Sequence, residues 1–155
     1  MKLNFLIITV LLISCRKEES TNYLANLKNN TNHLIIIKPY SNGQIVNANV
    51  INLSSFQEFQ IAKGFDRGLN GNTGFRSKYF ANCDSIRIIY DNLYTITHYI
   101  NTPLLLNNKY CLYSSNRNIF NAVNYAFSQK QLSKYQLENT YNFEFKEQDY
   151  LDAKP

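Results

Sequence analysis

The chain has 155 residues, a formal net charge of +5 and a hydrophobic content of 45%. This length suits one domain with a substantial core and is short for two. Lysines and arginines are scattered with no run of three, and no motif that reads nucleic acid is present, so we expect no nucleic-acid partner. Twelve tyrosines, ten phenylalanines and many β-branched residues favour strands, and an all-β fold is expected.

The first 14 residues have the build of a secretory signal peptide. Lys2 provides a positive start, and a largely apolar run follows from Leu3 to Ile13. As a helix this run would be about 16 Å long, well short of the ~30 Å hydrocarbon core of a bilayer. A buried N-terminal helix or strand is the alternative interpretation. We expect residues 1–14 to form a signal helix that is cleaved from the mature protein.

The next residues, Leu12-Ile13-Ser14-Cys15, resemble the lipobox of bacterial lipoproteins, in which a small residue precedes the lipidated cysteine. The resemblance implies a diacylglycerol on Cys15 and anchoring to the membrane, because two or more acyl chains hold firmly where one does not. Lys17, Glu18 and Glu19 are similar to the export signal of surface-exposed outer-membrane lipoproteins of the Bacteroidota type. An ordinary solvated linker on a periplasm-facing protein is the alternative. Residues 15–22 are then a lipidated tether, and residues 23–155 are expected to form a single domain.

The first third of that domain alternates strands and turn residues. The pattern predicts a strand over Tyr23–Lys28, a turn rich in asparagine, and a doubly apolar strand over His33–Lys38. Asn42-Gly43 is the strongest short hairpin signal in the chain, and it should lead into a return strand over Gln44–Leu53. With a further short strand over Phe56–Ile61, this region is predicted to be a β-meander.

The remaining segments continue the strand pattern. A hairpin is predicted around Asp91-Asn92, between strands at Asp84–Tyr90 and Leu93–Ile100, and later strands at Asn107–Ser114, Asn121–Gln131 and Leu137–Phe145. The last of these shows a strict period of two, typical of a half-buried strand. Residues 146–153 should add one or two helical turns. About eight strands at this spacing indicate an antiparallel β-sandwich, or a barrel-like variant of it.

This layout also resembles a broad class of small Bacteroidota lipoproteins, with a lipobox followed by acidic residues, an Asn-rich strand-and-turn domain, and a final aromatic strand. In this chain that strand contains Tyr141-Asn142-Phe143-Glu144-Phe145 and leads to Asp149-Tyr150. The resemblance spans most of the chain but is loose in every motif. It implies an envelope location and carries no particular activity.

One glycine-rich segment is the best candidate for a binding loop. Glycine allows positive φ and close approach of a ligand to the backbone, and consecutive N–H groups with an arginine could hold an anion. The alternative is a long connection without a ligand. The candidate residues are Gly64, Arg67, Gly68, Gly71, Gly74 and Arg76.

Chemistry-bearing residues are few. The only histidines, His33 and His98, lie in predicted strands without the further ligands that a metal site needs, so structural roles are favoured. Cys83 and Cys111 could pair in an oxidising envelope or remain two buried thiols. We therefore expect no catalytic residues, no metal and no cofactor apart from the covalent lipid.

These expectations combine into a non-enzymatic, outer-membrane-anchored binding protein with a protein or glycan partner. Exposed tyrosines could stack on sugar rings while asparagines hydrogen-bond to them. Two alternatives share the same anchor: an envelope immunity or inhibitor protein, and an accessory subunit of an outer-membrane uptake or assembly complex. The identity of the partner and the oligomeric state are not determined by the sequence.

Overall fold

The computed structural model describes residues 18–69, 80–102 and 109–155. These residues form two packed sheets, and neither sheet closes into a barrel. Sheet A has the strand order β5-β1-β10-β9, with β1 Ser20–Asn29, β5 Glu58–Arg67, β9 Ala126–Ser133 and β10 Gln136–Phe145. Sheet B has the order β3-β2-β6-β7-β8, with β2 Ile35–Ser41, β3 Gln44–Ile45, β6 Ser85–Tyr90, β7 Tyr94–Tyr99 and β8 Tyr110–Cys111; β4, Ile51–Leu53, also pairs with β2.

The predicted all-β sandwich is confirmed, but its strands are not all antiparallel. Most neighbouring strands are antiparallel, but β1 runs parallel to β10 and β8 runs parallel to β7. Both sheets are therefore mixed. The expected C-terminal helical turns are also present, as α2, Glu147–Ala153.

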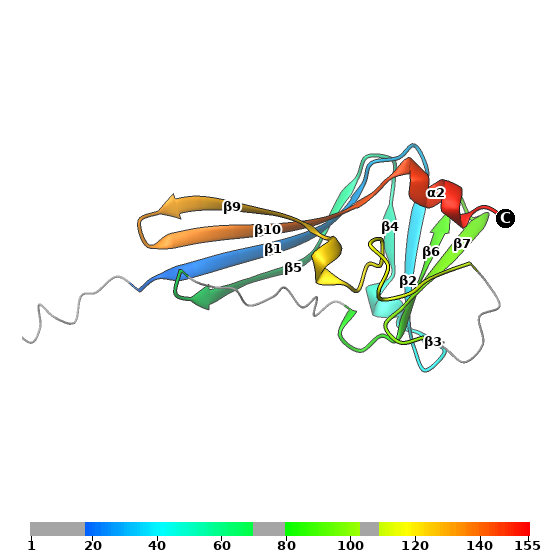
Figure 1. Cartoon of the computed structure of the whole chain (residues 1–155), viewed down its shortest axis with the longest axis horizontal. Helices are drawn as coiled ribbons and strands as arrows, with labels where there is room; N and C mark the ends of the chain where they lie inside the picture. Colours follow the sequence, from blue (N-terminus) through cyan, green and yellow to red (C-terminus); the bar gives the residue numbers. More distant parts are fainter. Residues whose placement is uncertain (1–17, 70–79, 103–108) are drawn as a thin grey trace, which may run out of the picture.

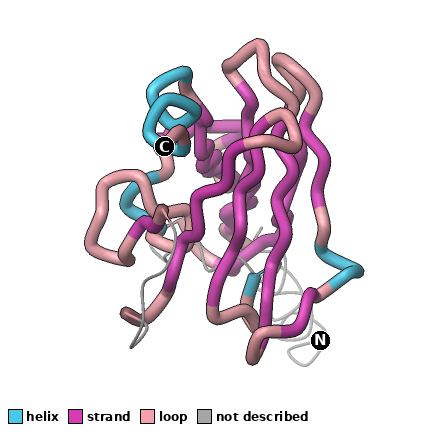
Figure 2. The backbone as a smooth tube through the Cα atoms, turned by 90° about the vertical axis from the view of Figure 1, so that its right-hand side faces the viewer, coloured by secondary structure: helices cyan, strands magenta, loops and turns pink. Residues whose placement is uncertain are grey.

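Sheet A is longer than sheet B and projects beyond it. Figure 1 shows the paired strands of sheet A extending away from the sandwich, with β1 beginning at the free end of this arm. After a turn of 90°, which brings the right-hand side of Figure 1 to the viewer, the strands of sheet B lie side by side with α2 near one end (Figure 2). The core is confined to the region where the two sheets overlap, and β9 has no buried residue.

Alternation of side chains builds the shared core. In β1, Ala25 and Leu27 are fully buried, and their register partners on β10 share the same face because paired residues of neighbouring strands point alike. Phe143 and Phe145 extend this apolar face along β10. Sheet B contributes fully buried residues at the same spacing of two: Ile35, Ile37, Ile86, Ile88 and Tyr90.

Both predicted hairpin turns are confirmed by the backbone. Asn42 and Gly43 have φ values of 50° and 77°, and Asp91 and Asn92 have φ values of 52° and 60°. Two consecutive residues with positive φ are characteristic of the type I′ turn that suits the twist of a hairpin. Asparagine and aspartate tolerate this conformation better than other non-glycine residues.

The predicted meander in the first third is wrong. Strand β1 pairs with β5 and β10 in sheet A, whereas β2 pairs with β6 and β4 in sheet B, so the Asn29–Leu34 connection crosses between sheets. The buried Asn29 side chain holds this crossing, donating to the carbonyl oxygens of His33 and Ser54 at 2.7 and 2.9 Å. A local pattern cannot reveal such a long-range choice of partner.

Several strand limits also differ from the predictions. Residues 20–22, expected in the tether, belong to β1 and pair with both β5 and β10. The predicted strand Gln44–Leu53 is interrupted by a 3₁₀ turn at Asn47–Asn49, and the strand predicted from Asn121 starts only at Ala126, after a 3₁₀ turn over Ala122–Asn124. Of the strand predicted over Asn107–Ser114, β8 alone remains; residues 107 and 108 lie outside the described part.

A candidate binding cavity beside helix α2

A cavity of about 450 Å³ lies where the end of β10, helix α2 and the loop after β8 meet the core face of sheet B. This volume falls within the range of small-molecule sites, roughly 300–1,000 Å³. The lining residues are Tyr90, Ile96, His98, Lys109, Tyr110, Cys111, Leu112, Ser114, Ser115, Asn116, Arg117, Phe143, Phe145, Asp149 and Asp152.

Strand register brings three of these residues onto one face. Tyr90 pairs with Tyr94, Ile88 with Ile96, and Ile86 with His98, so all six side chains share the core face of β6 and β7. Ile96 therefore lies between Tyr90 and His98 along the cavity wall. Phe143 and Phe145, at the end of β10, provide the apolar side opposite.

Tyr90 contributes a buried hydroxyl group without a partner. Its side chain is 0% exposed, and among the described residues Tyr90 Oη is the single buried side-chain N or O atom that lacks a hydrogen bond. Burial raises the pKa of Tyr90 well above its ordinary value, and the nearby charge of Asp149 adds to the effect. The hydroxyl is therefore neutral at physiological pH and can donate or accept a hydrogen bond.

His98, a largely buried residue, offers an uncharged polar group at the cavity wall. The backbone N–H of Ile119 donates to His98 Nδ1 at 3.1 Å, so the neutral ring carries its proton on Nε2. Burial, helped by the positive charge of Arg117, lowers the pKa of His98 to about 3. Within the described ranges no acceptor is found for this Nε2–H, which makes it a fixed, uncharged donor at the cavity wall.

An ion pair between Arg117 and Asp149 joins the loop after β8 to helix α2. Arg117 Nε donates to Asp149 Oδ1 at 2.7 Å, and Nη2 donates to Asp149 Oδ2 and to the Glu144 carbonyl oxygen. The guanidinium group also lies over the Phe143 ring, 5.0 Å from its centroid. Asp149 in turn accepts from the backbone N–H of Lys146 at 2.7 Å and so caps the start of the helix. The position of α2 thus depends on this pair.

Asn118 fixes the loop that forms the other side of the cavity. It is fully buried, and its amide nitrogen donates to the carbonyl oxygens of Tyr99 and Cys111 at 3.0 and 2.9 Å. Its amide oxygen accepts from the backbone N–H of Phe120 at 2.9 Å. One side chain therefore ties the loop to β7 and β8.

The two cysteines of the folded region are free. Cys83 and Cys111 are both buried and do not form a disulfide, which decides between the two alternatives left open by the sequence. Burial raises the pKa of the Cys111 thiol, which lines the cavity. Cys111 is therefore a protonated, weakly reactive thiol at neutral pH.

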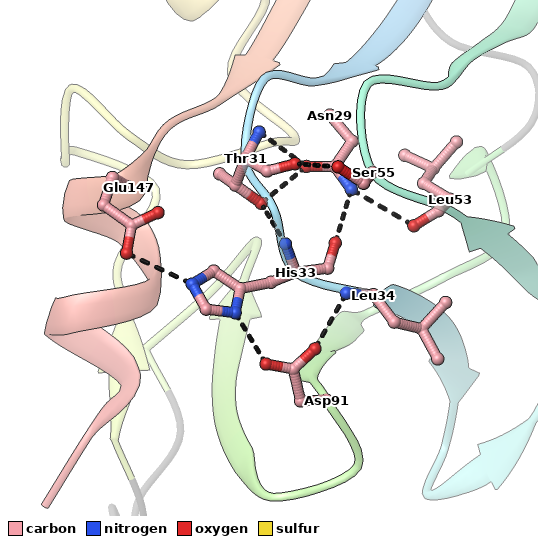
Figure 3. A network of polar contacts seen from close by, with 8 residues as sticks. All are labelled: Asn29, Thr31, His33, Leu34, Leu53, Ser55, Asp91 and Glu147. Atoms are coloured by element: carbon pink, nitrogen blue, oxygen red, sulfur yellow. Dashed lines mark hydrogen bonds and ion pairs between the residues drawn. The ribbon is translucent and has the colours of Figure 1, made fainter.

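A second cluster of side chains contacts helix α2. It consists of His33, Asp91, Glu147 and Tyr150, and we call it the α2 latch. His33 Nδ1 contacts Asp91 Oδ2 at 2.6 Å and Nε2 contacts Glu147 Oε1 at 3.1 Å, as Figure 3 shows. The imidazole ring also stacks on Tyr150 with centroids 3.5 Å apart. Burial opposes the imidazolium charge, but the two carboxylates outweigh it and raise the pKa of His33.

No match comes from known proteins. No family model matches the chain, and neither does any curated protein or solved structure. In the described part of the chain no helix is long and apolar enough to span a membrane. Over the same residues no group of three or more His, Cys, Asp and Glu side chains is arranged to hold a metal ion.

None of the site residues that were predicted from the sequence and that the structure describes lines the cavity. Cys15, Lys17, Gly71, Gly74 and Arg76 lie outside the described residues. Glu18 and Glu19 are exposed at the start of β1, where Glu18 contacts Arg67 at 3.5 Å. Gly64 and Arg67, predicted in a loop, are strand residues of β5, and only Gly68 follows the strand.

The two described glycines of that segment have structural roles. A Cβ at Gly64 would lie 2.2 Å from the Tyr23 hydroxyl oxygen, because the tyrosine ring of β1 lies across the glycine of β5. Gly68 has a φ of 93°, and its backbone binds the first strand, with its N–H donating to Glu19 O and its carbonyl accepting from Thr21 Oγ1. Both glycines therefore shape the arm, and neither faces the cavity.

The principal cavity residues were not found by sequence reasoning. Tyr90, Arg117 and Asp149 come from β6, a loop and α2, and 32 residues separate Arg117 from Asp149. The acidic Asp149-Tyr150 ending of the chain was noted, but nothing in its spacing indicates the arginine that it meets.

Proposed function

We propose that this protein is a lipid-anchored lipoprotein of the outer membrane, exposed at the cell surface, and that its sandwich domain binds a ligand in the cavity without catalysis. The observation that carries the binding proposal is the cavity of about 450 Å³ with the uncharged His98 Nε2–H donor on its wall, for which no acceptor is found among the described residues. A mostly apolar cavity with a few fixed polar groups is the usual form of a small-molecule site.

The anchor part of the proposal depends on Cys15 and on Lys17-Glu18-Glu19. Only four residues separate Cys15 from Ser20, where β1 begins at the free end of the arm (Figure 1). A strand of ten residues is roughly 33 Å long. With a lipid on Cys15, sheet A would act as a spacer that holds the cavity about 30 Å from the bilayer.

The chemistry of the lining favours binding over catalysis. A general base needs a pKa near the working pH, whereas the pKa of His98 is lowered to about 3 and its basic nitrogen accepts a backbone N–H. The Cys111 thiol is protonated, and the Asp149 carboxylate is occupied by Arg117 and by the helix N-terminus. None of these groups is prepared to transfer a proton or to attack a substrate.

The anchor is tested by labelling cells with palmitate. We expect label on the full chain and none on Cys15→Ala, and we expect protease added to intact cells to cleave the wild-type protein but not the triple alanine variant of Lys17, Glu18 and Glu19. Label that persists in Cys15→Ala refutes the anchor. A triple variant that stays accessible to protease refutes the export signal.

The cavity is tested by filling it. Full chain purified from membranes should carry a small molecule that denaturation releases and mass spectrometry detects. Ile96→Phe puts a larger side chain into the cavity and should abolish this ligand, whereas Val123→Phe, at a site 83% exposed, should not. Equal amounts of ligand from both variants would refute binding in this cavity.

A protein partner is a second candidate, and one observation favours it. Strand β9 forms an edge of sheet A with all eight residues exposed, including Phe127 and Leu132 at 56% and 41%. An exposed edge can add a strand from another chain, which suits an inhibitor or an accessory subunit. A crosslinked pull-down from intact cells should then lose its protein partner when both side chains are replaced by lysine.

A further inference from the structure

The outer faces of the two sheets, which point away from the core, differ in how their charges are paired. On sheet A, charged residues in register have opposite signs. Lys130 is paired with Glu138, and Lys28 lies between Glu58 and Glu144. The Lys28 ammonium group also forms an ion pair with Glu58 at 3.2 Å. Because opposite charges at directly paired positions attract each other, the charged pairs of sheet A are satisfied within the protein.

On the outer face of sheet B, two cations occupy directly paired positions instead. Lys38 of β2 is the register partner of Arg87 of β6, and strand alternation places both side chains on the face away from the core. Like charges in this arrangement destabilise a sheet. Thr97 of β7 is the next register partner of Arg87, and its N–H donates to the Lys109 carbonyl oxygen at 2.9 Å. Lys38, Arg87 and Lys109 thus follow one line across the strands, and we call them the cationic row.

No carboxylate in the described part of the chain forms an ion pair with the cationic row. All eleven aspartates and glutamates lie among the described residues, and none of them belongs to a strand described in sheet B. Asp84 and Asp91 flank β6 and have other partners. Asp84 accepts from the backbone N–H of Asn42 at 2.6 Å, and Asp91 contacts His33. The charge of the row is therefore available to an anion from outside the chain.

The cationic row is accessible, and hydroxyl groups lie beside it. Arg87 and Lys109 are exposed, and Lys38 is half-buried. Arg87 and Lys109 both line a groove of about 370 Å³, whose lining also includes Thr95. The Arg87 guanidinium group lies over the Tyr40 ring, 4.6 Å from its centroid, and this contact orients it. An oriented guanidinium group can bind a carboxylate through two parallel hydrogen bonds, while the hydroxyl groups suit further oxygen atoms of the same partner.

The length of the row favours a chain of charges over a single ion. Neighbouring strands lie about 4.8 Å apart, so the row spans about 14 Å from β2 to the segment beside β7 that contains Lys109. One small anion cannot contact both ends of such a row. A linear polymer with repeated acidic groups can contact all three cations when it lies across the strands.

We propose that the cationic row is a second binding surface, separate from the cavity, and that it binds an acidic polysaccharide through its carboxylate groups. The choice of partner rests on the proposed surface anchor. An arm of about 30 Å holds sheet B well beyond one Debye length, about 8 Å, from the phosphate groups of the bilayer. Single-stranded nucleic acid would need open aromatic faces for its bases, and Arg87 already covers one face of Tyr40.

The test measures binding of four probes to the full chain in neutral detergent by titration calorimetry. The probes are oligogalacturonate, its uncharged methyl ester, and oligothymidylate and oligoglutamate with the same number of negative charges. We expect oligogalacturonate to bind most tightly and its affinity to fall as salt is added. Equal affinity for the methyl ester would overturn recognition of charge. Tighter binding of oligothymidylate or oligoglutamate would overturn the polysaccharide as the partner.

Matched variants locate the binding surface. Arg87→Gln should weaken oligogalacturonate binding by about tenfold, the effect of one lost hydrogen bond to a charged group, and Arg87→Lys should restore part of it. Lys130→Gln removes the same charge from the outer face of sheet A, and its affinity should equal that of the wild type. Equal losses in Arg87→Gln and Lys130→Gln would show attraction to net charge alone and overturn the site.

Thermal unfolding separates lost binding from lost folding. Arg87→Gln removes the repulsion from Lys38, so its thermal midpoint should be equal to or above that of the wild type. Lys38→Gln is the second variant, with the same expectation for stability and a weaker affinity for oligogalacturonate. Wild-type affinity in both variants would overturn the row. Palmitate labelling of Cys15 tests the anchor by itself, so its failure and the failure of the row are distinguishable.

Discussion

Two buried tyrosines differ in their hydrogen bonding, and replacing each by phenylalanine should change the free energy of unfolding in opposite directions. Tyr90 and Tyr125 are 0% and 5% exposed, but only Tyr125 Oη has a protein acceptor, the Ile119 carbonyl oxygen at 2.9 Å. Replacing either residue by phenylalanine keeps the ring and its packing. The two substitutions therefore differ mainly in whether a hydrogen bond is removed.

The expected magnitudes follow from the cost of burying a hydroxyl group. An unpaired buried hydroxyl costs about 1–3 kcal/mol in proteins, so Tyr90→Phe should raise the free energy of unfolding of the ligand-free chain by about 1 kcal/mol. Tyr125→Phe leaves the Ile119 carbonyl without this donor and should lower stability by about 1–1.5 kcal/mol.

Urea unfolding monitored by circular dichroism measures both changes, with the midpoint compared at constant slope. Thermal midpoints should move by roughly 3 °C upward for Tyr90→Phe and by a similar amount downward for Tyr125→Phe. A destabilising Tyr90→Phe would mean that the hydroxyl already has a partner in the ligand-free protein. The description of Tyr90 Oη as an unpaired buried hydroxyl would then fail.

Three other perturbations test the surrounding structure. Gly64→Ala should lower the free energy of unfolding by about 1–3 kcal/mol, because the new Cβ would displace the Tyr23 ring. At Gly43 a new Cβ would meet no atom within 4 Å, so Gly43→Ala should cost only the strain of the positive φ, about 1–2 kcal/mol. Because the pKa of His33 is raised in the folded protein, its contribution to stability should be complete below pH 6.5, its ordinary pKa, and should disappear as pH rises through the raised value. Urea midpoints of the wild type measured from pH 5 to 9 should therefore decrease over this range, and the midpoints of His33→Gln should not show this decrease. Asn118→Ala should cost more than about 2 kcal/mol, since it removes the three hydrogen bonds of a fully buried side chain. A change within about 0.5 kcal/mol in calorimetry would contradict the role of that side chain.

The sequence correctly predicted those strands and turns that depend mainly on residues close together in the chain. The period of two over Leu137–Phe145 identified β10, and the pairs Asn42-Gly43 and Asp91-Asn92 identified two hairpins, because turn type depends on residues that accept positive φ. The choice of strand partners was not predictable in this way. β1 could pair with β2 or cross to another sheet with the same local pattern, and the buried side chain of Asn29 favours the crossing.

The cavity could not be predicted for the same reason. Tyr90 was recognised as a strand residue, but the cavity beside it is formed in part by α2, whose position depends on the contact between Arg117 and Asp149. Asn118 lies in a loop, and nothing in the local pattern indicates that its buried side chain links this loop to β7 and β8. In both cases the functional property arises from contacts between distant segments.

The central claim is that the cavity beside α2 is the binding site, and a crystal structure of the full chain purified from membranes with its ligand tests it most directly. The account predicts the ligand in the cavity, within hydrogen-bond distance of His98 Nε2 and against Ile96. A ligand bound instead on the arm, near Gly68 or along β9, with the cavity holding only water, would contradict it.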